Sequence, residues 1–112
     1  MTYLPDNWVI LEFKQDDGEI FHKVLAGWSG GYLDGDHWRM NSGITKIVTN
    51  ENNYDIYGQT GSIYTVRKES ELVRANMSGI LRQLTDTGRA KQVDIKQVDI
   101  TDILQEYNED GN

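Results

Sequence analysis

The hydrophobic pattern of this chain changes its period near Ser70, and that change constrains the fold more than any other feature. Before it, short apolar segments alternate with period two between turn residues, as in antiparallel strands. After it, five apolar residues share one helical face: Val73, Met77, Ile80, Leu81 and Leu84. We therefore expect a single α+β domain over 1–112, with a β-rich body over 1–68 and a helix, a strand and a short terminal helix over 69–112.

The β-rich body divides into strands and turns. The Asp-Gly pair within residues 15–18 favours a tight hairpin. Residues 27–36 are expected to form a glycine-rich loop, and residues 41–43 a bulge or turn. The expected strands cover residues 8–14, 19–26, 37–40, 44–49, 54–57 and 63–66. Short strands at regular spacing predict a curled antiparallel sheet or small open barrel of five or six strands, with one long helix packed on it.

Capping residues suggest where the helices begin and end. The long helix is expected to begin after Ser70, an N-cap residue type, and to end with Gly88 at or near its C′ position. Residues 101–107 predict a short C-terminal helix, with Asp102 as its cap and Gln105 three positions later.

A tandem pentapeptide precedes that terminal helix. Residues 91–95 read Lys-Gln-Val-Asp-Ile, and residues 96–100 repeat them. In a strand over 92–98, an odd repeat length turns the second copy to the opposite face. We therefore expect a bulge between the copies or a break before the second.

Charge and composition exclude several classes of function. The chain has a net charge of −7 and no cysteine. The absence of cysteine excludes disulfides, thiolate nucleophiles and cysteine-ligated zinc. The acidic balance argues against binding a phosphate backbone, so nucleic acid is an unfavoured partner. With no signal pattern and no apolar run near ~20 residues, we expect a cytoplasmic protein with no membrane partner.

Residues 27–44 are the candidate recognition segment. They hold five glycines and two of the three tryptophans. Aromatic residues and arginine dominate binding hot spots, and acidic residues would steer a basic partner. The candidate binding residues are Trp28, Tyr32, Asp34, Asp36, His37, Trp38 and Arg39. In the competing structural interpretation, Trp28 and Trp38 only close one end of the β-core.

An enzyme centred on Asp34, Asp36 and His37 is the first alternative. Two carboxylates and an imidazole could hold a hard cation or transfer protons. An EF-hand is excluded, since Thr45 occupies the position that requires glutamate, and no nucleophile stands at a recognisable spacing. The sequence predicts no resident metal and no cofactor. His22 is expected to be a half-buried strand residue, with a meeting of His22 and His37 across the sheet left open.

Weak single-stranded RNA binding is the second alternative. Tyr54, Tyr57 and Tyr64 lie on adjacent expected strands and could stack on bases. Lysine and arginine side chains, concentrated between Arg67 and Lys96, could contact the RNA backbone. Acidic residues lie among them, however, and favour a solvated surface of salt bridges instead.

One stretch also resembles a known class of proteins. Residues 23–44 (KVLAGWSGGYLDGDHWRMNSGI), followed by 57–64 (YGQTGSIY), resemble small accessory proteins of tailed bacteriophages, including phages of cyanobacteria. The resemblance spans about 7–68 and brings no catalytic residues. It implies a phage-encoded, non-virion protein that acts in the host cytoplasm, where many such proteins bind a host factor. We therefore predict a non-enzymatic protein-binding module, with its oligomeric state open and a homodimer included.

Overall fold

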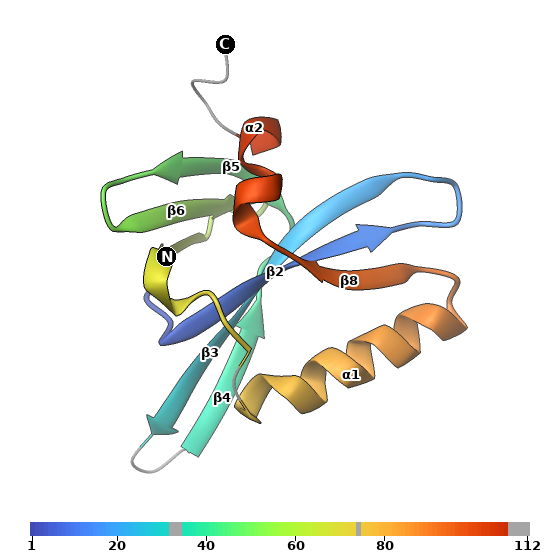
Figure 1. The fold of residues 1–112 in the computed structure, drawn as a ribbon, viewed down its shortest axis with the longest axis horizontal. Coiled ribbons are helices and arrows are strands. Elements are labelled where there is room, and N and C mark those ends of the chain that lie inside the picture. Colours follow the sequence, from blue (N-terminus) through green and yellow to red (C-terminus); the bar gives the residue numbers. More distant parts are fainter. Residues whose placement is uncertain (32–34, 74, 108–112) are drawn as a thin grey trace.

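The computed structural model describes residues 1–31, 35–73 and 75–107, and their strands form two four-stranded sheets (Figure 1). The strand orders are β1-β7-β6-β5 and β4-β3-β2-β8, antiparallel except for the β1–β7 pair. The strands are β1 (Thr2–Tyr3), β2 (Asn7–Lys14), β3 (Ile20–Gly31), β4 (Gly35–Met40), β5 (Ile44–Thr49), β6 (Asn53–Gly58), β7 (Ile63–Arg67) and β8 (Asp94–Val98). The helices are η1 (Lys68–Ser70), α1 (Ala75–Ala90), η2 (Ile100–Asp102) and α2 (Leu104–Tyr107).

The α+β class is confirmed, but the expected single curled sheet or barrel of five or six strands is wrong. The chain leaves the β4-β3-β2-β8 sheet at the expected turn over residues 41–43. There Asn41 donates its backbone N–H to the Val24 carbonyl (3.1 Å) and accepts the Val24 N–H on Oδ1 (2.9 Å). This side-chain bond ends the pairing of β4 with β3, so the next strand, β5, joins the other sheet.

Strand β2 lies at the centre of the molecule because both of its faces are buried. Trp8 and Ile10 enter a core between the two sheets, which we call the inter-sheet core. Val9 and Leu11 enter a second core, the helix-side core, against α1. The strand expected over residues 8–14 is confirmed, and its alternating side chains supply two cores.

The expected loop over 27–36 is wrong in the described residues. Strand β3 continues to Gly31 and β4 begins at Gly35, so this segment is a long hairpin with a shift of register between Trp28 and Gly31. Cross-strand pairs such as Trp28 with His37 compensate for the low strand propensity of the glycines.

Other turns and strands agree more closely with the sequence pattern. The hairpin at 15–18 is confirmed: Gly18 has φ +88° and donates its N–H to the Gln15 carbonyl. Strands β5, β6 and β7 lie within one residue of the expected ranges. The two-residue strand β1, parallel to β7, has no counterpart among the expected strands.

Helix α1 begins at Ala75, later than expected. Ser70 belongs to η1 rather than capping α1, and Glu71 forms an isolated bridge with Trp8. Pairing with the start of β2 thus holds this segment extended. The predicted apolar face is confirmed, with Met77 fully buried in the helix-side core.

The end of α1 also differs from expectation. Gly88 lies inside the helix, while Gln92 occupies the left-handed C′ position with φ +60°. Val93 donates to the Gly88 carbonyl (2.7 Å) and Gln92 to the Arg89 carbonyl (3.2 Å), the hydrogen-bond pattern of a Schellman motif.

The two pentapeptide copies meet within one regular strand. β8 pairs continuously with β2 from Asp94 to Val98, so the expected bulge is absent, and the strand ends only after Val98. Ile95 enters the helix-side core and Ile100 the inter-sheet core. The helix expected over 101–107 forms as η2 and the short α2. Asp102, its expected cap, lies inside η2, and Asp99 caps η2.

Candidate functional site

A groove opens between the N-terminal segment and the β3–β4 hairpin. We call it the N-terminal groove; its volume is about 420 Å³. Its lining residues are Thr2, Tyr3, Leu4, Trp28, His37, Trp38 and Arg39. Four of the seven predicted binding residues therefore lie together here.

The pairing of β1 with β7 brings the N-terminal segment to the hairpin. Tyr3 stacks on Tyr64, with ring centroids 4.8 Å apart, and meets Trp28 edge to face at 6.3 Å. The Trp28 indole N–H donates to the Leu4 carbonyl at 3.0 Å. These contacts fix the N-terminal segment as one wall of the groove.

Stacked rings and one cation form the other wall. His37 stacks on Trp28 with centroids 5.0 Å apart and ring planes 6° from parallel. The Arg39 guanidinium carbon lies 4.7 Å from the centre of the Tyr3 ring, within cation–π range. His37 and Arg39 are exposed, whereas Trp28 is half-buried.

Strand alternation separates Trp38 from these groups. His37 pairs with Trp28 and Arg39 with Ala26, so both side chains lie on the inter-sheet face of β4. Trp38 pairs with Gly27 and lies on the opposite face, where 41% of it remains exposed. The interpretation that Trp28 and Trp38 seal a core therefore fails for Trp38 and holds in part for Trp28.

The remaining predicted site residues are described less fully. Tyr32 and Asp34 lie outside the described residues, and Asp36 is described only as part of β4. Conversely, Tyr3 and Leu4 line the groove although no sequence pattern marked them. Their roles arise from β1, a strand too short to show periodicity.

His22 is the second histidine, and it lies away from the groove. It occupies β3 as expected but is more deeply buried, with 2% of it exposed. His22 pairs with Glu12, whereas His37 pairs with Trp28, so the two histidines do not meet. Its Nε2 lies 3.1 Å from Glu12 Oε1 and its Nδ1 lies 2.7 Å from the Tyr107 hydroxyl.

This carboxylate–imidazole–hydroxyl chain is poorly suited to nucleophilic catalysis. Burial raises the pKa of Tyr107 to about 12, and the charges of Glu106 and Glu12 act in the same direction. A lowered pKa helps to activate a nucleophile, whereas this raised pKa opposes ionisation of the hydroxyl even beside His22. The contact instead ties α2 to β3, across 85 residues of sequence.

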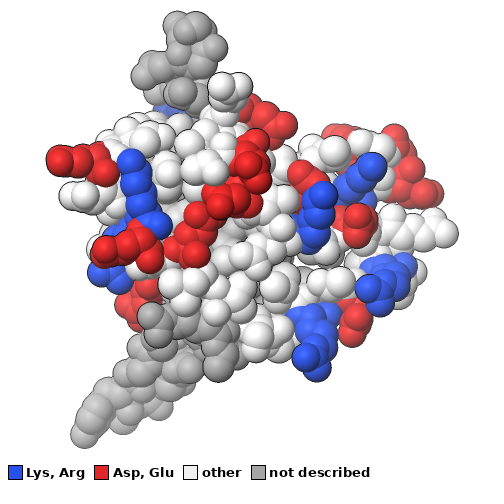
Figure 2. All heavy atoms as spheres, in the orientation of Figure 1, with Lys and Arg blue, Asp and Glu red and all other residues white. Residues whose placement is uncertain are grey.

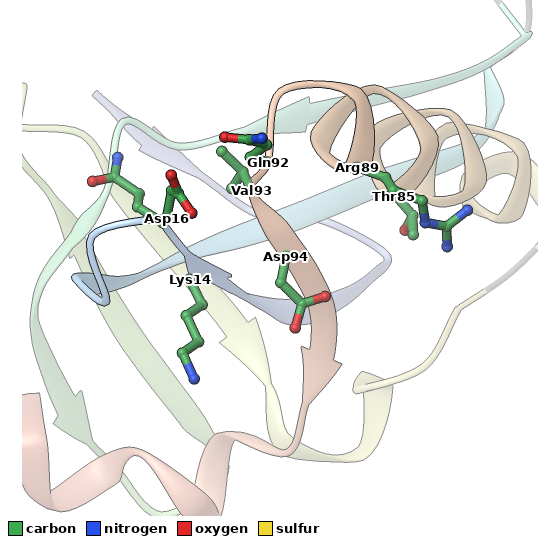
Figure 3. A pocket seen from close by; sticks show the side chains of 8 residues that line it. Lys14, Asp16, Thr85, Arg89, Gln92, Val93 and Asp94 are labelled. Atoms are coloured by element: carbon green, nitrogen blue, oxygen red, sulfur yellow. The ribbon is translucent and has the colours of Figure 1, made fainter.

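A second groove of about 410 Å³ lies between the β2–β3 turn and the end of α1. Its walls include Lys14, Asp16, Arg89 and Asp94. Figure 3 shows the Lys14 and Arg89 side chains extending in different directions, so their charged ends do not converge on one ligand position. Catalytic sites require such convergence, and this groove does not supply it.

Acidic side chains form a band across the face shown in Figure 2. Near η2, the charges of Asp99 and Asp102 raise the pKa of Glu71, in addition to the larger effect of burial. The Ile100 N–H donates to Glu71 Oε2 at 2.8 Å. Among the residues that the structure describes, no three potential ligands converge as a metal site would need.

The tyrosines proposed to stack on RNA do not share an exposed face. Tyr54 and Tyr64 are buried in the inter-sheet core. The third, Tyr57, is half-buried, and the Lys46 ammonium lies 4.2 Å from the centre of its ring. These positions therefore do not form the exposed stacking platform that the RNA-binding alternative would need.

Within the described ranges, no helix is long and apolar enough to cross a membrane. No protein-family model matches the chain, and neither the curated proteins nor the solved structures contain a significant match.

Proposed function

We propose that this protein is a non-enzymatic protein-binding module that holds a short segment of its partner in the N-terminal groove. The observation that carries the proposal is the ring cluster at the groove, in which Tyr3 meets Trp28 edge to face and His37 stacks on Trp28. Trp38, on the opposite face of β4, adds an exposed indole at the same strand. Rings already held in place lose little conformational freedom on binding, and such residues supply binding hot spots.

The charge of the groove identifies the chemistry of the partner segment. Among the described residues that line it, Arg39 is a cation and none is acidic, although the chain carries a net charge of −7. A segment with Asp or Glu side chains would therefore be attracted here and repelled by the rest of the surface. The resemblance to phage accessory proteins makes a bacterial host protein in the cytoplasm the proposed source of that segment.

Selection from a random peptide library displayed on phage tests this function. Wild type is compared with Arg39→Glu and Trp38→Ala. The matched controls are Arg82→Glu on α1 and Ile20→Ala, whose side chains are exposed away from the groove. Circular dichroism verifies that every variant is folded.

We expect wild type and both controls to enrich the same acidic peptides. Arg39→Glu and Trp38→Ala should bind those peptides about tenfold more weakly, equivalent to roughly 1.4 kcal/mol. If no peptide is enriched, or if all five proteins bind the selected peptides equally, the groove is not a peptide-binding site.

A further inference from the structure

The four outer strands of the two sheets differ in how they are protected. Exposed strand edges invite pairing with other chains, and proteins protect them by shortness, bulges, cover or charge. β1 has two residues, and β5 carries an extra residue between Ile44 and Lys46 and lies against α2. β8 carries the alternating charges Asp94 and Lys96.

β4 also contacts α1, but it is neither short nor bulged itself. It has six residues, and its described side chains include the exposed His37, Trp38 and Arg39. The irregularity in its pairing does not bend β4 itself. The span from Trp28 to Gly31 is one residue longer than the facing span from His37 to Gly35, so the extra residue lies in β3.

The hydrogen bonds at the end of β4 establish which backbone groups point outward. Asn41 and Val24 are bonded across the pair, through the Asn41 N–H and side chain. In antiparallel strands, bonded and non-bonded pairs alternate. The Arg39–Ala26 and His37–Trp28 pairs are therefore bonded, whereas the N–H and C=O of Trp38 point away from β3.

Side chains around that outward-facing peptide group differ between the two faces. His37 and Arg39 project on the face of the N-terminal groove, and Trp38 projects on the other. An added antiparallel strand would place one residue directly opposite Trp38 and its two neighbours opposite His37 and Arg39. Charge complementarity favours acidic neighbours, and the indole favours an apolar residue between them.

We propose that β4 accepts an extended segment of the partner as a fifth strand of its sheet, with apolar and acidic residues alternating along that segment. The proposal rests on the proposed function and gives its partner a conformation and a sequence pattern. Backbone hydrogen bonds would supply affinity, while the two faces of β4 would select the side chains.

Backbone methylation of a designed peptide tests the mode of binding. The probe is fluorescent, acetylated and amidated Glu-Val-Glu-Val-Glu-Val-Glu, measured by polarisation. A valine opposite Trp38 directs its N–H toward β4, whereas the adjacent glutamates direct theirs away. Methylating the central valine nitrogen should weaken binding at least about tenfold, the upper range for one hydrogen bond. Methylating an adjacent glutamate nitrogen should change affinity by less than about threefold.

Charge exchange tests the side-chain pattern. The same peptide with lysine in place of glutamate should bind wild type at least about tenfold more weakly, and Arg39→Glu should reverse that preference. Hydrogen exchange at the Trp38 amide should slow when the glutamate peptide binds, because that N–H becomes bonded.

Different experimental outcomes would contradict strand addition and the proposed function. Equal effects of methylation on valine and glutamate, or an unprotected Trp38 amide, would overturn strand addition. So would library-selected peptides that bind through Arg39 and Trp38 while the glutamate–valine peptide does not, although the proposed function would then stand. If no peptide of either kind binds, both proposals fail.

Discussion

Gly88 lies in the last turn of α1, where the helix comes closest to β8. A Cβ atom at this position would lie 2.7 Å from both the Val93 carbonyl oxygen and Ile95 Cδ1. We expect Gly88→Ala to lower the free energy of unfolding by about 1–3 kcal/mol, as overpacking does. Gly79→Ala is the control: its Cβ would meet nothing within 4 Å, so it should stabilise by about 1 kcal/mol in urea titrations.

Replacing Gln92, at the same end of α1, should make the protein more stable. Its φ of +60° is unfavourable for a residue with a side chain, whereas glycine accepts it. Gln92→Gly should therefore raise the free energy of unfolding by roughly 0.5–1 kcal/mol. Gln97→Gly, at the same place in the second pentapeptide but inside β8, should lower it, and a loss from both changes would contradict this account.

At the scale of elements, the repeated pentapeptide contributes one isoleucine to each core, Ile95 from β8 and Ile100 from η2. Ile95 and Ile100 are both buried, with 8% and 1% exposed, but in different clusters. We expect Ile95→Ala and Ile100→Ala each to cost about 2–5 kcal/mol. Because the two side chains lie in separate clusters, the double variant should equal their sum within about 0.5 kcal/mol in chemical denaturation. A larger deviation would mean that the two cores are coupled.

Elements whose local pattern is strong were predictable from the sequence. Alternation located β2, β5, β6 and β7, and the helical period located the apolar face of α1. The secondary-structure predictions were wrong where pairing with a distant strand outweighs local propensity. Residues 27–31 are rich in glycine yet extended, and Glu71 is drawn beside Trp8 rather than into α1.

At the scale of the whole molecule, the acidic surface near η2 affects stability through Glu71. Burial raises the pKa of Glu71, the Ile100 N–H lowers it, and Asp99 and Asp102 raise it. A carboxyl whose pKa is raised on folding contributes stability below its unfolded pKa, and that contribution is lost as the pH rises through the folded pKa. Glu71→Gln keeps an acceptor for Ile100, so it should stabilise the protein at pH 7. The gain should shrink as the pH falls through the raised folded pKa of Glu71, and it should be absent below 4.5, the ordinary value for glutamate.

The pKa of Asp99, in the same region, is shifted in the opposite direction. Hydrogen bonds from the Thr101 N–H and hydroxyl lower its pKa, against a small opposing effect of burial. Its contribution is therefore present above its unfolded pKa and lost as the pH falls through the folded pKa. Asp99→Ala should destabilise at pH 7 and lose that effect below its ordinary value of 3.8. Thermal unfolding across this pH range checks both variants, and parallel curves would contradict the assignment.

The sequence by itself determined where β2, β5, β6 and β7 form, which face of α1 is apolar, and that residues 27–44 hold an aromatic and charged segment. These features depend on neighbours within a few residues, so periodicity and composition express them. Tertiary structure alone decided that two sheets form, that Tyr3 and Leu4 join the groove, and that β4 lies at an edge. Such outcomes depend on contacts across long sequence separations, such as Trp28 with Leu4, 24 residues apart. Many arrangements of paired strands are compatible with the same local sequence pattern. Only the simultaneous packing of the inter-sheet core and the helix-side core selects one of them.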